Sequence, residues 1–230
     1  MRDSTFDDAE LNEAIFDGSL LSCVSFRGAK LFKASFRDAD LHNVDFSESD
    51  LRFADLSHLD LTTVQFRGAV LGKARMMGCD LSNTDLSACV LSLADLREAD
   101  LCGSVARGNL QHVDLRGAKL GDVDWENADL RSADLRNVVF HMGASRGGLL
   151  FSPFASEGTR TGFYTDELME QHFKSPEEIR KANLKGVNLL GADIGGVDFY
   201  LVDLRGAIMS RNQYEYAAAS GAILHDSRVT

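Results

Sequence analysis

The chain has 230 residues, of which 24 are basic and 35 acidic, and its formal net charge is −11. This excess of carboxylates argues against direct binding to nucleic acid and suits a partner with a basic surface. No apolar run reaches the length of about 18 residues that a membrane-spanning helix needs, and no basic and then apolar leader opens the chain. We therefore expect a cytoplasmic protein that contacts neither membrane nor nucleic acid directly.

Large apolar residues recur at every fifth position. The twenty positions reached by steps of five from Phe6 to Leu101 hold Leu, Phe or, at position 76, Met, and the residue two before each is small except for Leu59. A period of five fits neither a helix nor an alternating strand. It fits a chain that turns a corner every five residues and returns to its starting direction after four corners, with the large and the small residue facing inward.

Units such as ADLRE, ADLCG, ANLKG and VDLRG resemble the A(D/N)LXX pentapeptide repeat. The resemblance implies an all-β fold, the right-handed quadrilateral β-helix, in which four units make one coil and coils stabilise each other by stacking. We predict four segments: the β-helix over 1–140, a loop and helical insertion over 141–181, the final coils over 182–209, and a capping helix with tail over 210–230.

The period loses one residue between Leu101 and Leu110. We place the four-residue step at Val105 and expect Gly103 and Gly108 in the small inward slots. The coil is then pinched or the rod slightly bent, and a purely structural slip is the favoured interpretation.

The insertion over 141–181 begins with a Gly-rich composition and predicts two short helices. Thr165 can cap the first, and Ser175, Pro176 and Glu178 form a cap, a first-position proline and a capping box for the second. Its many apolar residues indicate packing on the rod or on a partner.

The tail predicts a helix that starts after Ser210 and ends at Gly221. Such a helix would cover the open end of the last coil, whose strand edges and apolar side chains need covering. One short helix cannot easily bury all the apolar residues of this end, and the acidic N-terminal end would repel a second copy. We therefore predict a homodimer that joins two C-terminal ends about a twofold axis, through Met209, Tyr214, Tyr216, Ile223 and Leu224.

No catalytic or metal-binding motif stands out. The four cysteines and six histidines show no metal-ligand spacing, and no nucleophile elbow or phosphate-cradling loop occurs. A regular tube also offers no deep cleft for chemistry. We expect no catalytic residue, no metal and no cofactor, and therefore no enzyme.

One side of the predicted rod carries Asp40, Asp60, Asp80 and Asp100, twenty residues apart. They should stack as a ladder at intervals of about 5 Å. In one interpretation the ladder presents a DNA-like line of charge to a partner. In the simpler one, Asp is the common residue of this slot because it hydrogen-bonds the turn.

Another side, which carries the inward Leu31, Leu51, Leu71 and Leu91, has apolar residues in its outward slots. We call these the apolar stripe: Phe32, Phe53, Val70, Val90 and Leu93. Such a stripe is unusual on a solvated surface, and it could receive the insertion, a partner or a second copy.

The tail DLRGAIMSRNQYEYAAASGAIL resembles the end of Qnr-type quinolone-resistance proteins. That resemblance implies end-to-end dimers of acidic rods that imitate the DNA bound by DNA gyrase and topoisomerase IV. The chain departs from the pattern by lacking early loop insertions and by carrying the late one. We predict a DNA mimic that binds a type II topoisomerase and protects it from an inhibitor. The alternative is a scaffold that binds another partner through the apolar stripe and the insertion.

Overall fold

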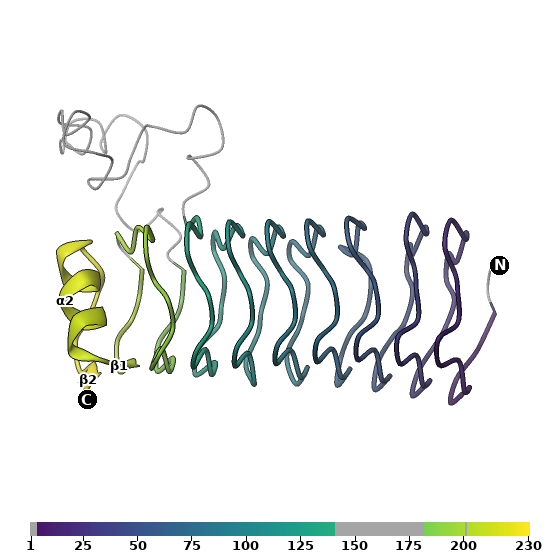
Figure 1. The fold of residues 1–230 in the computed structure, drawn as a ribbon, viewed down its shortest axis with the longest axis horizontal. Helices are drawn as coiled ribbons and strands as arrows, with labels where there is room; N and C mark the ends of the chain where they lie inside the picture. The colour runs from purple at the N-terminus through teal and green to yellow at the C-terminus, as the bar shows by residue number, and fades with distance from the viewer. Residues whose placement is uncertain (1–3, 141–181, 201) are drawn as a thin grey trace, which may run out of the picture.

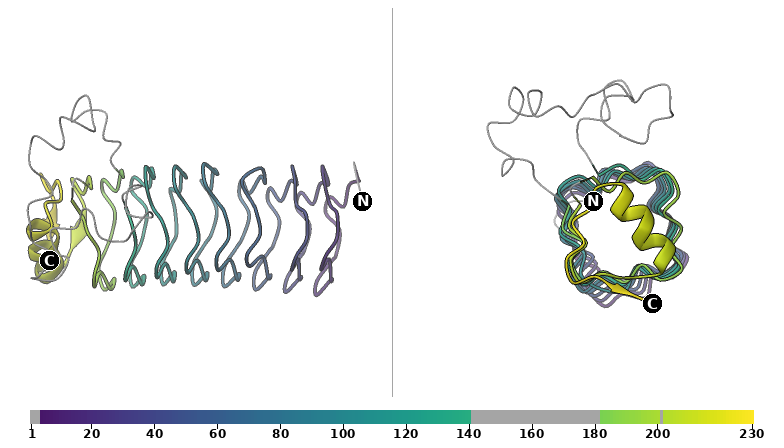
Figure 2. Two further views of the ribbon diagram at one scale, coloured as in Figure 1. Left: turned by 90° about the horizontal axis from the view of Figure 1, so that it is seen from above. Right: turned by 90° about the vertical axis from the view of Figure 1, so that its left-hand side faces the viewer.

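In the computed structural model, which describes residues 4–140, 182–200 and 202–230, the chain winds into a rod of stacked coils (Figure 1). The described residues begin at one end of the rod and finish at the other, and each coil is square when seen along the rod (Figure 2). We number the four sides in chain order and name each by one inward residue: side 1 by Phe26, side 2 by Leu31, side 3 by Phe36 and side 4 by Leu41. Sides 2 and 4 are therefore opposite each other.

Successive coils are joined by parallel backbone bridges between residues twenty apart, such as Glu10 with Lys30. The Lys30 amide donates to the Ala9 carbonyl at 2.9 Å, and the Leu11 amide donates to the Lys30 carbonyl at 2.8 Å. Most units end in a turn whose second residue has a positive φ, for example 63° at Gly28 and 57° at Asn83. Glycine and asparagine tolerate this left-handed conformation best, so the turn slot favours them.

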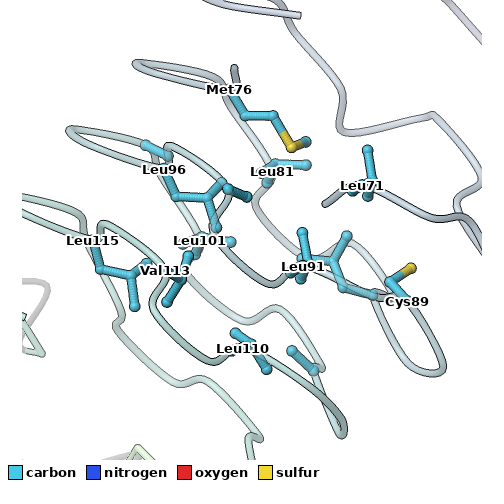
Figure 3. Packing of buried hydrophobic residues seen from close by; sticks show 14 of the residues in the cluster. Leu71, Met76, Leu81, Cys89, Leu91, Leu96, Leu101, Leu110, Val113 and Leu115 are labelled. Atoms are coloured by element: carbon cyan, nitrogen blue, oxygen red, sulfur yellow. The ribbon is translucent and has the colours of Figure 1, made fainter. Parts of the chain in front are cut away.

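The interior is a continuous column of inward side chains. In the first coils of side 1, the Phe26 ring stacks on Phe6 at 5.2 Å and on Phe46 at 5.3 Å. On side 3, Met76 and Leu96 take the place of the rings in the middle of the rod, and both lie among the buried residues of Figure 3. The predicted inward slots of the regular units are thus the core.

The irregular coil differs from the prediction. The inward residue is Ala106 and not Val105, and the small slot before it holds Ser104; both are fully buried. Val105 instead bridges Asp85 and Asp124 along the outside of side 1. The four-residue step therefore lies between Ala106 and Leu110, one unit later than predicted.

Gly103 is also misplaced by the prediction, because it lies in a turn with a φ of 69°, whereas Gly108 does occupy the small slot before Leu110. The small pair Ser104 and Ala106 leaves room for the indole of Trp125 in the next coil. That side chain is fully buried, and its Nε1 donates to Ser104 Oγ at 3.3 Å.

The coils on either side of the insertion stack directly on each other. Asn183 bridges Asp124 as the next residue of side 1, and Arg136 Nε lies 3.4 Å from Asp193 Oδ2 on side 3. The insertion therefore leaves and rejoins the rod at the corner between sides 4 and 1 without changing the order of the sides. The helices predicted within 141–181 lie outside the described residues.

The C-terminal end is closed by three elements: β1 (Ile208–Met209), α2 (Arg211–Ala219) and β2 (Arg228–Val229). Helix α2 crosses the open square of the last coil (Figure 2), as predicted from the tail. Ser210 and Gln213 form a capping box at its start. Gln213 Nε2 also donates to the Leu189 and Ala192 carbonyls at 2.5 and 2.9 Å, and β2 then pairs in parallel with β1.

Side 3 carries a zigzag of ion pairs that runs from coil to coil. Arg97 contacts Asp95 at 2.7 Å in its own unit and Asp114 at 3.7 Å in the next coil. The same arrangement repeats at Arg116 and Arg136. Single exposed pairs stabilise little, but a network with bidentate geometry contributes more.

Replacing Leu81 by Ala should lower the free energy of unfolding by about 2 to 5 kcal/mol, because the side chain is fully buried in a packed column. Ser82→Ala, at the next and partly exposed position, should change it by less than about 0.5 kcal/mol. Urea denaturation followed by circular dichroism measures both. Equal losses would show that the inward register is misassigned.

The ion-pair zigzag should make stability depend on pH. Hydrogen bonds from Arg97 and Arg136 hold the pKa values of Asp95 and Asp134 below the ordinary value. These carboxylates therefore stabilise the fold above the unfolded pKa of about 3.9, and this contribution is lost as pH falls through the lower folded value. We expect Tm to fall below about pH 4 more steeply in the wild type than in a variant with Arg97, Arg116 and Arg136 changed to Gln. Parallel Tm curves would contradict this role.

Candidate functional site

The four sides of the rod differ in how their carboxylates are compensated. On side 3 each Asp of the zigzag has an Arg partner, and on side 1 Arg27 lies 3.8 Å from Asp45 and 3.7 Å from Glu48. Side 4 carries Asp40, Asp60, Asp80 and Asp100, and its units in those coils contain no Lys or Arg. Side 4 therefore carries a column of carboxylates in which Asp100 alone has an ion-pair partner among the described residues, Lys119 of the next coil.

Asp60, Asp80 and Asp100 form three rungs of the ladder that the sequence predicts, and Asp40 holds the same slot one coil earlier, where it bridges Leu20. Asp80 bridges Asp60 on one side and Asp100 on the other, and the Leu61 amide donates to the Asp80 carbonyl at 2.8 Å. Each carboxylate also accepts a hydrogen bond from the backbone amide two residues on, at 3.0 Å in both Asp60 and Asp80. The hydrogen bond from Asp to the turn, on which the simpler interpretation rests, is therefore present. It holds the carboxylate in one orientation but leaves its negative charge.

Two members of the ladder have lowered pKa values. The Thr62 hydroxyl and amide hydrogen-bond Asp60 and lower its pKa. At Asp100 burial raises the pKa, but hydrogen bonds from Lys119 and Cys102 outweigh it and the net pKa is lowered. Lys119 Nζ lies 2.9 Å from Asp100 Oδ2, so this cation marks the end of the ladder.

The apolar stripe lies on side 2, opposite the ladder. The rings of Phe32 and Phe53 meet edge to face at 5.4 Å, and Val70 bridges Val90. Phe53 is 43% exposed and Leu93 49%. The structure thus brings the predicted residues together across four successive coils.

Cations accompany this stripe, and the sequence analysis did not single them out. Lys33 Nζ lies 5.3 Å and the Arg52 guanidinium 5.8 Å from the Phe32 ring centre, and Lys73 Nζ lies 5.1 Å from that of Phe53. Lys33 and Lys73 share the turn slot of Phe53, so a column-wise reading of side 2 would have found them.

The predicted dimer residues divide into two groups. Met209 is fully buried in its own rod, so it is not available at the surface. Tyr214, Ile223 and Leu224 are partly exposed and line a shallow hollow at the C-terminal end. Tyr216 is partly exposed and packs against Phe199 at 6.3 Å.

The cysteines have structural surroundings. Cys79 and Cys89 occupy small inward slots and donate to the Leu56 and Phe66 carbonyls, and burial raises the pKa of both thiols to about 12. Among the described residues no group of three or more His, Cys, Asp or Glu side chains could hold a metal ion. Within the same ranges, no helix is long and apolar enough to cross a membrane.

A family model described as pentapeptide repeats matches the chain in 8 copies, over residues 1–38, 9–47, 45–83, 79–108, 109–141 and 179–211. A search of curated proteins found no match.

Three solved structures are similar to parts or most of this chain. HetL, a pentapeptide repeat protein involved in heterocyst differentiation regulation in Nostoc sp. strain PCC 7120, is 21% identical over 99% of this chain and 87% of HetL, with a TM-score of 0.31. A trypsin-treated form of QnrB1, a plasmid-mediated fluoroquinolone resistance protein, is 14% identical over 95% of this chain and 94% of its own, with a TM-score of 0.36. A pentapeptide repeat protein of the Arabidopsis thaliana thylakoid lumen is 24% identical over 62% and 68%, with a TM-score of 0.23.

Pentapeptide repeat proteins form right-handed quadrilateral β-helices and are in general structural or interaction proteins. The square coils, the inward large and small residues and the extent of the matched repeats all agree with that architecture. The chain belongs to the pentapeptide repeat family.

Proposed function

We propose that this protein is a non-enzymatic rod that binds a type II topoisomerase, DNA gyrase or topoisomerase IV, as a DNA mimic in the cytoplasm and protects it from an inhibitor. The observation that carries the proposal is the ladder on side 4: aspartates stacked in adjacent coils with no Lys or Arg in their units.

The ladder offers what a DNA-binding surface recognises without base contacts. DNA presents a regular line of negative charge, and coils about 4.8 Å apart hold carboxylates in an equally regular line. The backbone amides that bond Asp60 and Asp80 keep the carboxylates oriented, so little side-chain entropy is lost on binding. The arginine pairs of side 3 remove the equivalent charge there.

A dimer of this chain with twofold symmetry would suit a partner that itself has twofold symmetry. The proposed dimer joins two C-terminal ends, which lie beyond α2 and β2. Val229 is 46% exposed, and Ile223 and Leu224 are partly exposed beside it. Joining two such ends would bury the same apolar surface on both copies and place one acidic ladder on each half of the longer rod.

A second candidate function is a scaffold for a different protein. The exposed Phe53 and Leu93 favour it, because large apolar side chains in contact with solvent mark interaction surfaces.

Reversing Asp60, Asp80 and Asp100 to Lys should abolish binding to gyrase and topoisomerase IV, because the ladder then repels a basic groove. A supercoiling assay with purified enzyme, with and without a quinolone, measures inhibition and protection as the protein is titrated. The control is the triple change of Asp38, Glu48 and Glu98 to Lys, which alters net charge equally on other sides. Wild-type protein that binds neither enzyme at low salt would exclude this function.

The dimer makes a separate prediction. Truncation after Ser210 should give a monomer or an aggregate in light scattering, because it removes α2 and β2. Val229→Glu leaves the cap in place and should give a folded monomer, whereas Glu98→Lys should remain dimeric. A truncated chain that stays a dimer of unchanged stability would place the contact elsewhere.

A further inference from the structure

We propose that side 2 docks an acidic protein segment that carries apolar anchor residues, at a surface separate from the ladder on side 4. The surface consists of the apolar stripe and the cations Lys33, Arg52 and Lys73. The inference goes beyond the proposed topoisomerase binding and does not depend on it.

Two residues of this surface adopt a backbone conformation that is unfavourable for their side chains. Phe53 and Leu93 stand in the second turn position with φ values of 62° and 63°. Most units of the described coils hold Gly, Asn, Asp, Lys or Glu in this position, and no other large apolar residue has a positive φ among the described residues. A bulky side chain in this conformation is strained, so these two residues reduce the stability of the coil.

Their solvent exposure adds a second unfavourable term. Phe53 is 43% exposed and Leu93 49% exposed. Phe53 has the ring of Phe32 as a neighbour at 5.4 Å, but the interior of the rod gains nothing from either residue. Two unfavourable choices on one side, separated by Lys73 in the coil between them, point to contact with another molecule.

The charge of side 2 identifies the partner's chemistry. In the four coils of the stripe this side holds Lys30, Lys33, Arg52 and Lys73 against Asp50 alone, in a chain whose net charge is −11. Arg52 forms an ion pair with Asp50 at 2.6 Å. Lys30 pairs with Glu10 of the first coil, and Lys33 pairs with Glu13 of the same coil. These exposed pairs leave the surface a small positive excess at Lys73, in the coil between Phe53 and Leu93, and a carboxylate-bearing partner fits that excess.

The rings are arranged for a peptide more than for a nucleic acid. Single-stranded nucleic acids stack their bases on exposed aromatic faces. Here Lys33 and Arg52 lie within 5.3 and 5.8 Å of the Phe32 ring centre, and Lys73 lies within 5.1 Å of that of Phe53. Cations therefore already approach the ring faces, and the acidic remainder of the rod repels a polyanion. An extended segment with alternating acidic and apolar residues could place carboxylates on the cations and apolar side chains against Phe53 and Leu93.

Sides 2 and 4 face away from each other across the square coil (Figure 2). A segment on side 2 therefore leaves the ladder accessible, and the rod can hold an acidic and a basic partner together.

The test uses fluorescein-labelled synthetic peptides of equal length, one alternating Glu with Phe and one alternating Lys with Phe, and labelled oligo-dT. Fluorescence anisotropy should show that the full chain binds the Glu–Phe peptide and not the other two probes. The double change Phe53→Asn and Leu93→Asn should weaken that binding on the order of tenfold or more. Its Tm should equal or exceed that of the wild type, because Asn tolerates the turn conformation better.

Ile15→Ser is the matched control, since Ile15 is 77% exposed outside the stripe, and it should bind the Glu–Phe peptide as the wild type does. Absence of binding to the wild type, or equal binding by the double variant, overturns the proposal. Tighter binding of oligo-dT would assign side 2 to nucleic acid instead. The Asp60, Asp80 and Asp100 reversal should retain peptide binding, so failure here is distinguishable from failure of the topoisomerase proposal.

Discussion

The register of twenty residues between coils is the constraint on which the rest of the molecule depends. Each coil is a single turn of the chain, and the backbone of a bridge residue hydrogen-bonds to the neighbouring coil. The Lys30 amide donates to Ala9, and the Lys30 carbonyl accepts from Leu11, both of the preceding coil. These backbone groups have no partner inside their own coil, so a coil is stable only beside another. At the C-terminal end the side-chain amide of Gln213 occupies two carbonyls of the last full coil, and β2 provides a final strand for β1.

Because of the same register, residues at equivalent positions of successive coils stack in a column along each side of the rod. The residue that follows the inward Leu then decides whether a neighbouring Asp is compensated. On side 3 it is Arg in the sequences DLR at 95–97, 114–116 and 134–136, and each guanidinium pairs within its unit and with the next coil. On side 4 it is His42, Thr62, Ser82 and Cys102, which bond the preceding carboxylate through neutral groups, and only Asp100 also has a cation, Lys119 of the next coil. Sides 3 and 4 both have Asp before the inward residue, and they differ in charge because the residue after it is Arg on side 3 and is not basic on side 4.

The period of five was enough to predict the coils and the inward residues, because a narrow tube enforces residue size at nearly every inward position. It failed at the irregular coil, where Ala106 faces inward and Val105 does not. A search for large residues passes over an alanine, and only the burial of Trp125 in the next coil explains why a small residue stands there. Met209 is a different case, because steps of five from Leu184 also place it inward, and the dimer prediction counted it only as an apolar residue of the tail. The cations beside Phe32 and Phe53 become visible only when residues are read along a side.

Interior packing and backbone pairing supply the stability of the rod, so the outward slots are free to vary. A residue in an outward slot that follows local preference, such as Asn83 in its turn, therefore carries little information about function. Phe53 and Leu93 are different, since they occupy a strained conformation and expose apolar surface where Gly, Asn or Asp would cost less. In a solenoid with so few constraints on its outside, the informative positions are those where the sequence departs from what the turn prefers. The aspartates of the ladder suit their slot because they hydrogen-bond the turn, and they are informative only because few cations lie beside them. Phe53 and Leu93 of the apolar stripe are unfavourable both in their turn conformation and in their exposure to solvent.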